Sequence, residues 1–261
     1  MDVADNEIHL WFSCDRDIQE HTASEKYLRL LDESEKKRHQ TFRFDQHKHQ
    51  YLVTRALIRT VLSMYHPDVA PEQWQFKKNK HGKPFIGNVT SYDTVTFNVS
   101  HTDGLIVLAI AKTQEVGVDV EFLNRRGRLL EVADRYFSPS EIEALFSLPE
   151  EMQRTRFFDL WTLKEAYIKA CGMGLAIPLR HFSYQLDTDT GIDITFDPAR
   201  DDVAELWQFW SLEYDNLHPV ALAVRNEEAG GISDIKYYSV TPLQDTQEIH
   251  CNVIRKTGGV L

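Results

Sequence analysis

Val116-Gly117-Val118-Asp119-Val120-Glu121 is the stretch that most constrains the fold and chemistry of this chain. Its valines alternate with Gly117, Asp119 and Glu121, a pattern that predicts a β-strand with one apolar face. Residues two apart on a strand share a face, with Cα atoms roughly 6–7 Å apart, so both carboxylates can face one cation. Such a pair of oxygen ligands suits Mg²⁺, whose remaining coordination positions are usually filled by water and by phosphate oxygens of the substrate. Taken alone, Asp-x-Glu is more often the solvated face of an edge strand.

A later helical segment adds a third carboxylate. Arg156–Cys171 is apolar at helical intervals and stops at Gly172-Met173-Gly174, a typical C-terminal signal. Trp161, Glu165 and Lys169 are spaced i, i+4, i+8 and form one stripe on this helix. The stripe is either a surface Glu–Lys pair beside a core Trp, or a metal-binding carboxylate one turn before a cation that neutralises phosphate.

Two further segments favour the second interpretation. His81-Gly82-Lys83-Pro84-Phe85 puts Lys83 between a flexible and a rigid residue, where an anion could meet the ammonium and backbone groups. Phe97–Gly104 predicts a strand that runs into a turn, with Ser100 and His101 at the strand end. Either segment alone would be an ordinary turn.

In this order, the segments resemble the successive motifs of the 4′-phosphopantetheinyl transferases: Gly82–Pro84, Phe97–His101, Gly117–Glu121 and Phe158–Lys169. The length of 261 residues resembles the larger, surfactin-synthetase-activating (Sfp-like) type, not the short trimeric type. The resemblance implies an α+β fold of two similar halves related by a pseudo-twofold axis, with the active site at their interface, in a monomer. It implies Mg²⁺-dependent transfer of phosphopantetheine from coenzyme A to a serine of an apo acyl, polyketide or peptidyl carrier protein, releasing adenosine 3′,5′-bisphosphate.

Residue roles follow from the resemblance. The metal ligands, for Mg²⁺ or Mn²⁺ as a substitute, are Asp119, Glu121 and Glu165. The expected contacts to coenzyme A near its diphosphate and adenine are Lys83, Ser100, His101, Lys164 and Lys169. The basic segment that would meet its ribose 3′-phosphate comprises Lys36, Lys37, Arg38, Arg43, Lys48 and His49. Gln50 stands where an Arg is common, which leaves the cation for that phosphate open, and Glu141 matches a motif acid whose role is also open.

The expected catalytic residues are Glu121, Glu165 and Lys169. Phosphoryl-type transfer requires a protein mainly to position groups and to balance charge on oxygens. Lys169 and His101 could compensate charge as the bisphosphate leaves. The serine proton could pass to Glu165, to Glu121 or to a metal-bound water, and the sequence does not choose among them.

Composition narrows the class of protein. An apolar content of 42% with 26% charged residues is ordinary for a soluble globular chain. The longest apolar run, Leu105–Ala111, is too short for a bilayer, and the N-terminus lacks the pattern of a secretory signal. Cys14, Cys171 and Cys251 are odd in number and widely spaced, which indicates reduced thiols and a cytoplasmic protein.

The formal net charge of −11 disfavours nucleic acid as a partner and predicts weak long-range attraction to acidic carrier proteins. Carrier docking should then use an apolar patch with local cations, and not the overall field of the protein. Phe122, Leu123 and Arg128–Tyr136 are candidates for that surface, with core packing as the alternative. A kinase-like nucleotide enzyme is disfavoured because no Gly-x-x-x-x-Gly-Lys-Ser/Thr loop occurs. A non-catalytic binding module would be expected to have lost the carboxylates or Lys169.

Periodicity and turn residues predict the remaining elements. Helices are expected at Asp17–Arg43, Gln50–Tyr65, Leu129–Tyr136 and Pro139–Phe146. Strands are expected at Ile8–Ser13, Thr94–Val99, Leu105–Ala111, Phe182–Leu186, Ile192–Phe196, Trp207–Tyr214, Val220–Val224 and Ile235–Val240. We expect an N-terminal half at 1–113, a C-terminal half at 114–228 and an extension at 229–261, with Ile254–Leu261 disordered.

Overall fold

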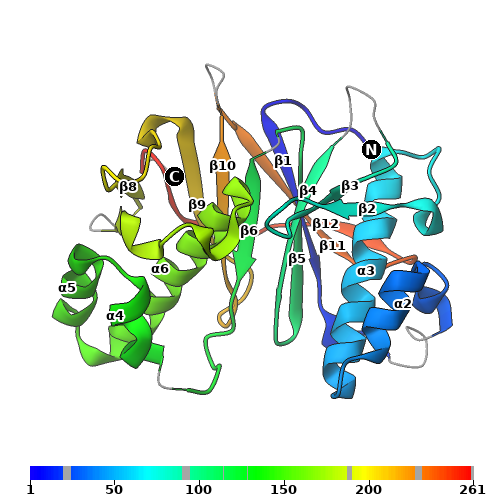
Figure 1. The fold of residues 1–261 in the computed structure, drawn as a ribbon, viewed down its shortest axis with the longest axis horizontal. Coiled ribbons are helices and arrows are strands. Elements are labelled where there is room, and N and C mark those ends of the chain that lie inside the picture. Colours follow the sequence, from blue (N-terminus) through cyan, green and yellow to red (C-terminus); the bar gives the residue numbers. More distant parts are fainter. Residues whose placement is uncertain are drawn as a thin grey trace.

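The computed structural model describes residues 1–19, 25–89, 95–113, 115–127, 129–186, 190–226 and 231–259. Two sheets lie side by side in the middle of the molecule, with helices on the outer side of each (Figure 1). The five-stranded sheet has the order β12-β11-β1-β5-β4, and the four-stranded sheet has the order β13-β9-β10-β6. This arrangement confirms the predicted α+β class.

The strands of the five-stranded sheet are β1 (Glu7–Ser13), β4 (Thr96–Thr102), β5 (Leu105–Ala111), β11 (Asp234–Val240) and β12 (Thr246–Ile249). Those of the four-stranded sheet are β6 (Val116–Val120), β9 (Trp207–Glu213), β10 (Pro219–Arg225) and β13 (Asn252–Lys256). Two small hairpins add β2 (Phe76–Lys78) with β3 (Pro84–Ile86), and β7 (Phe182–Gln185) with β8 (Asp193–Phe196). The predicted strands are therefore confirmed to within a few residues, although Thr94 lies outside the described residues.

In the N-terminal half, helix α3 (Asp45–Tyr65) buries its apolar face against the five-stranded sheet. It begins earlier than the predicted start at Gln50. The prediction of a helix from Asp17 to Arg43 is wrong, because α2 (Glu33–Gln40) starts anew after Asp32. Asp32 Oδ1 accepts a hydrogen bond from the Glu35 amide at 2.9 Å, and the Asp32 amide donates one to Glu35 Oε2 at 3.0 Å. This capping box ends any helix that approaches from the N-terminal side; residues 20–24 lie outside the described residues.

In the C-terminal half, the long helix α6 (Glu150–Cys171) packs on β6 and β10. It ends where predicted, at Gly172, whose φ of 64° is the left-handed conformation that glycine adopts easily. It begins six residues before the predicted Arg156, directly after Pro149. The predicted helices before it are confirmed as α4 (Ala133–Tyr136), preceded by the 3₁₀ turn Leu129–Val132, and α5 (Pro139–Ser147).

The C-terminal extension adds strands to both sheets. Strand β11 pairs parallel with β1, and β12 pairs with β11, whereas β13 pairs antiparallel with β9. The prediction that Ile254–Leu261 is disordered is wrong over 254–259, because β13 satisfies the open edge of β9 and Thr257 donates to Phe209 O at 3.0 Å. Residues 260 and 261 lie outside the described residues. The division at 113/114 and 228/229 remains a proposal.

The halves share a core where the two sheets face each other. This core contains residues of both sheets, including Ile8, Leu10, Phe12, Val107, Val116, Val118, Val120, Leu222 and Val224. Both faces of β6 are buried, so it is not the half-solvated edge strand that its pattern alone favoured. At Gly117, an added Cβ would lie 2.1 Å from Ala166 O, so only glycine allows β6 to approach α6 this closely. Among the described residues, no helix combines the length and apolar character needed to cross a membrane.

Candidate active site

The centre of the site is Asp119, which β6 holds at the junction of the two sheets. Its Oδ1 accepts hydrogen bonds from Ser100 Oγ on β4 at 2.8 Å and from Lys169 Nζ on α6 at 2.6 Å. Lys169 Nζ also donates to Ser100 Oγ at 2.7 Å. Asp119 is only 4% exposed, and its Oδ2 is buried with no hydrogen-bond partner in the described part of the chain. Three distant segments thus meet at one carboxylate that has an oxygen to spare.

Glu121 and Glu165 both lie close enough to Asp119 for its charge to affect their ionisation. Burial, with the charge of Asp119 as the next cause, raises the pKa of both glutamates. Glu121 Oε1 accepts a hydrogen bond from Trp161 Nε1 at 3.1 Å, and Arg125 lies 3.4 Å from Glu121 Oε2. The site therefore concentrates negative charge that Lys169 and Arg125 offset only in part.

The donor set was tested for its fit to a magnesium ion. Within the described residues, no three His, Cys, Asp or Glu side chains are already gathered into a metal-binding cluster. The chemistry nevertheless fits, because Asp119 Oδ2 is buried without a partner among the described residues, and Glu121 and Glu165 add two hard carboxylates. The pKa of each glutamate is raised first by burial and next by the charge of Asp119. A divalent cation would supply the missing positive charge.

His101 follows Ser100 at the end of β4. Partial desolvation and the ammonium of Lys169 lower the pKa of the imidazole, even though the residue as a whole is exposed. His101 lines a cavity of about 470 Å³ together with Glu121, Phe122 and Arg125. This cavity opens on one side of the Asp119 centre.

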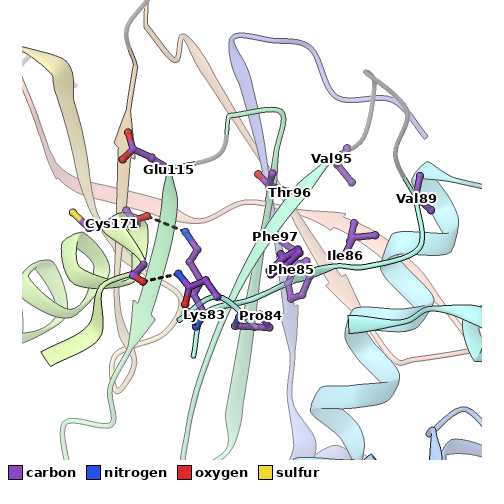
Figure 2. Close-up of a pocket in the computed structure, with 13 residues that line it drawn as sticks. Lys83, Pro84, Phe85, Ile86, Val89, Val95, Thr96, Phe97, Glu115 and Cys171 are labelled. Atoms are coloured by element: carbon purple, nitrogen blue, oxygen red, sulfur yellow. Dashed lines mark hydrogen bonds between the residues drawn. The ribbon is translucent and has the colours of Figure 1, made fainter. Parts of the chain in front are cut away.

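Two further cavities lie on the Lys169 side of the centre. One, of about 250 Å³, is lined by Glu165, Lys169 and Asn98 among others. It shares Lys83, Pro84 and Gly172 with a larger cavity of about 410 Å³ (Figure 2). The wall of the larger cavity away from α6 is mostly apolar and consists of Phe85, Ile86, Val89, Val95 and Phe97. The shared residues show that these two cavities are neighbours along the junction.

Lys83 reaches across these cavities to the C-terminal half, as Figure 2 shows. Its Nζ donates hydrogen bonds to Val116 O at 3.2 Å and to Ala170 O at 2.9 Å. Burial lowers the pKa of this amine to about 8. Lys83 therefore ties the hairpin loop to β6 and α6 while its stem lines both cavities.

Lys164 is not a ligand-binding residue, so its predicted contact to coenzyme A is wrong. Its side chain is fully buried on the opposite side of α6 from the site. It donates to Leu179 O at 2.8 Å and Phe182 O at 2.7 Å and forms an ion pair with Glu141 at 2.9 Å. Glu141, whose role was open, is thus its structural partner.

The N-terminal cations lie at the start of α3 and on α2, apart from the three cavities described above. Lys36 and Lys48 form exposed ion pairs with residues of their own helices, and Arg38 lies over the Phe42 ring. His49 Nε2 contacts Asp15 O at 2.8 Å. Neutral Gln50 donates to Thr102 O at 2.6 Å, which anchors α3 beside the strand end that carries His101.

Sequence reasoning missed Asn98 and Arg125 as parts of this site. Asn98 lies in the quoted Phe97–His101 motif, but its amide has no chemistry that singles it out. Arg125 follows Glu121 by four residues. This spacing predicts an ion pair only if the chain turns back after β6, which the sequence does not show.

The family models match along most of the chain. One described as "4′-phosphopantetheinyl transferase superfamily" matches residues 115–224, and one described as "4′-phosphopantetheinyl transferase, N-terminal" matches residues 19–113. The chain is 33% identical over 220 residues to the 4′-phosphopantetheinyl transferase HetI of Nostoc sp., covering 84% of this chain and 88% of that protein. A phosphopantetheinyl transferase of Thraustochytrium sp. is 31% identical, covering 77% of this chain and 72% of that protein.

The transferase Sfp of Bacillus subtilis is 28% identical over 171 residues, covering 66% of this chain and 73% of that protein. Among solved structures, the Thermotoga maritima holo-[acyl-carrier-protein] synthase matches with 23% identity and a TM-score of 0.35, covering 44% of this chain and 64% of that one. The chain belongs to the 4′-phosphopantetheinyl transferases. It is therefore an enzyme that transfers phosphopantetheine from coenzyme A to carrier proteins, a reaction that depends on Mg²⁺ throughout the family.

Proposed function

We propose that the Asp119 centre performs the transfer, with a serine of an apo acyl or peptidyl carrier protein as acceptor. The observation that carries this assignment is the state of Asp119. One of its oxygens is held by Ser100 and Lys169, and the other is buried without a partner. A purely structural aspartate at this depth would be expected to use both oxygens.

Asp119, Glu121 and Glu165 would hold Mg²⁺, or Mn²⁺ in its place. When bound, the ion supplies positive charge to the diphosphate of coenzyme A and so lowers the cost of bringing a serine oxygen to an anionic phosphorus. The charge of Asp119, which after burial is the next cause of the raised pKa of Glu121 and of Glu165, supports this assignment, because a cation would offset that charge.

The side chains around the centre balance charge and move a proton. The serine oxygen forms a bond to the phosphorus that carries pantetheine, and the bond from that phosphorus to the bisphosphate breaks. Lys169, which contacts Asp119, and His101, whose imidazole lies close enough to feel the Lys169 charge, would compensate the charge of the leaving bisphosphate. Glu121 or Glu165 would accept the serine proton, since each is a carboxylate close enough to Asp119 to feel its charge.

Coenzyme A would occupy the two cavities joined at Lys83. The apolar wall with Phe85 and Phe97 suits a nucleobase, and the cavity beside Lys169 leads from it to Asp119. Lys36, Arg38, Lys48 and His49 remain candidates for the 3′-phosphate. Because one chain supplies both sides of the site, we propose a monomer, and the free Cys14, Cys171 and Cys251 support action in the cytoplasm.

The experiment is the intact mass of an apo carrier protein after incubation with coenzyme A and Mg²⁺. The carrier should gain one phosphopantetheine, an excess of chelator should stop the gain, and added Mg²⁺ or Mn²⁺ should restore it. Modification that proceeds equally well in chelator would refute the metal assignment, and no modification of any acyl or peptidyl carrier would refute the acceptor.

A further inference from the structure

The junction between the halves depends on side chains, because β4 and β6 belong to different sheets. Each is the last strand of its sheet, so the outer edge of each would be left with open backbone groups. In the described residues, two side chains satisfy the outer edge of β6: Lys83 donates to Val116 O, and Asn98 Oδ1 accepts from the Val118 amide at 2.9 Å. Asn98 thus replaces a missing strand partner.

This contact lies beside the reacting centre. Asn98 and Ser100 are two residues apart on β4 and share a face, while Val118 immediately precedes Asp119 on β6. The Asn98–Val118 bond and the Ser100–Asp119 bond therefore fix the same register between the strands. Asn98 is 4% exposed and Val118 is fully buried, so water cannot readily replace the bond.

We propose that Asn98 is a positioning residue that sets β6 against β4 and so brings Asp119 and Glu121 into line with Ser100 and His101. The inference rests on the proposed role of the Asp119 centre. The other contacts of β6 leave it little freedom to compensate, because its inner edge pairs with β10 and Gly117 on its face already lies against the backbone of α6. Without the Asn98 oxygen, β6 would have to move to find a partner for the Val118 amide.

The test compares Asn98→Leu with Asn98→Asp. Leucine has a similar volume but no acceptor, whereas aspartate retains an oxygen for the Val118 amide. Asn88→Leu is the matched control, because Asn88 Oδ1 also accepts from a backbone amide, that of Gln75 at 3.1 Å, beside the β2–β3 hairpin. Thermal unfolding first establishes a temperature at which each protein is folded.

The readout independent of turnover is Mn²⁺ binding, measured by the loss of the free-ion electron paramagnetic resonance signal with and without coenzyme A. Supporting side chains of metal ligands are typically worth about 10–100-fold in affinity or activity. We expect Asn98→Leu to weaken Mn²⁺ binding and lower kcat by about this factor, Asn98→Asp to recover most of the Mn²⁺ binding, and Asn88→Leu to change neither.

If folded Asn98→Leu binds Mn²⁺ and turns over like the parent, the positioning role is refuted. The same holds if Asn98→Asp loses binding as fully as Asn98→Leu, since the acceptor oxygen would then not matter. Should Asn98→Leu fail to fold, Asn98→Ala is measured in the same way with the same criteria. A parent protein that binds no Mn²⁺ would instead refute the metal assignment.

Discussion

The ammonium of Lys169 lies 2.6 Å from Asp119 Oδ1 and 2.7 Å from Ser100 Oγ, so one side chain connects α6 with both junction strands. Asp119 is nearly buried, whereas the Lys169 side chain is 28% exposed. Asp119 and Lys169 should therefore differ in how much free energy it costs when the other residue of the pair is removed. A lysine left alone can be hydrated, but an aspartate left alone stays buried with its charge.

Asp119→Ala should abolish turnover and leave the fold largely intact. The carboxylate is the centre of the proposed metal site, while its removal leaves only a partly exposed lysine. Supporting partners of metal ligands are typically worth about 10–100-fold, so for a ligand we expect kcat to fall by more than about 100-fold, to below detection, and the melting temperature to change little. Calorimetry and carrier mass together check this, and a large drop in melting temperature that accounts for the lost activity would assign Asp119 a structural role.

Lys169→Ala should reduce kcat more than it weakens coenzyme A binding. A cation beside the leaving phosphate acts most strongly as charge shifts in the transition state. Steady-state kinetics with varied coenzyme A separate the two effects. A raised KM with unchanged kcat would instead place Lys169 in binding that is equal in the ground and transition states.

At the scale of elements, α6 serves two purposes on opposite sides. Glu165 and Lys169 face the junction, whereas Lys164 faces the core of the C-terminal half. There, Glu141 also accepts hydrogen bonds from the amides of Ser138 at 2.8 Å and Tyr184 at 2.9 Å. One buried ion pair thus joins α5, α6 and β7 and holds the helix that carries the site.

Lys164→Met should destabilise the protein strongly, because it leaves Glu141 charged and buried without its cation. Breaking such a pair typically costs about 3–5 kcal/mol. Adding Glu141→Gln should recover part of the loss, since the amide oxygen can still accept from Tyr184. Denaturant unfolding of the two single variants and the double variant measures this coupling, and equal stability of Lys164→Met and the parent would contradict it.

For the whole molecule, the segment after β6 and the turn before β10 contact the other half of the molecule through His218. His218 contacts Asp215 on its own turn and Asp103 O in the other half, and it stacks on the Phe122 ring. Phe122 and Leu123 are half-buried. In the Arg128–Tyr136 stretch, Arg128 lies outside the described residues, and the other residues range from buried to exposed. Core packing therefore takes up part of the predicted docking surface.

Carrier affinity should depend only weakly on salt. The enzyme carries a formal net charge of −11, so long-range attraction to an acidic carrier is weak and the apolar part of the surface should set most of the affinity. Titration of an apo carrier at low and high ionic strength checks this. A steep loss of affinity with salt would show that exposed cations such as Arg125 and Arg126 dominate docking.

Local sequence patterns were sufficient to predict most of the helices and strands of this protein and the family to which it belongs. The alternating valines of β6, the apolar spacing of α6 and the glycine after Cys171 identified their elements, because period and end signals depend on near neighbours. The order of the motifs identified the family and brought forward Asp119, Glu165 and Lys169. The start of α2 is also a local signal, because Asp32 and Glu35 form its capping box, although both residues stand within a long polar run.

Contacts between distant segments needed the tertiary structure. Lys164 and Lys169 lie about 140° apart around α6 at 3.6 residues per turn, but the helix period does not say which side meets the core and which meets β4. Likewise, β13 exists because the edge of β9 is open, and Asn98 matters because Val118 lies opposite it. Whether a side chain is buried, and whether its polar atoms find hydrogen-bond partners, depends on how the whole chain packs. These two properties decide whether a charged or amide side chain binds a ligand or holds the fold together.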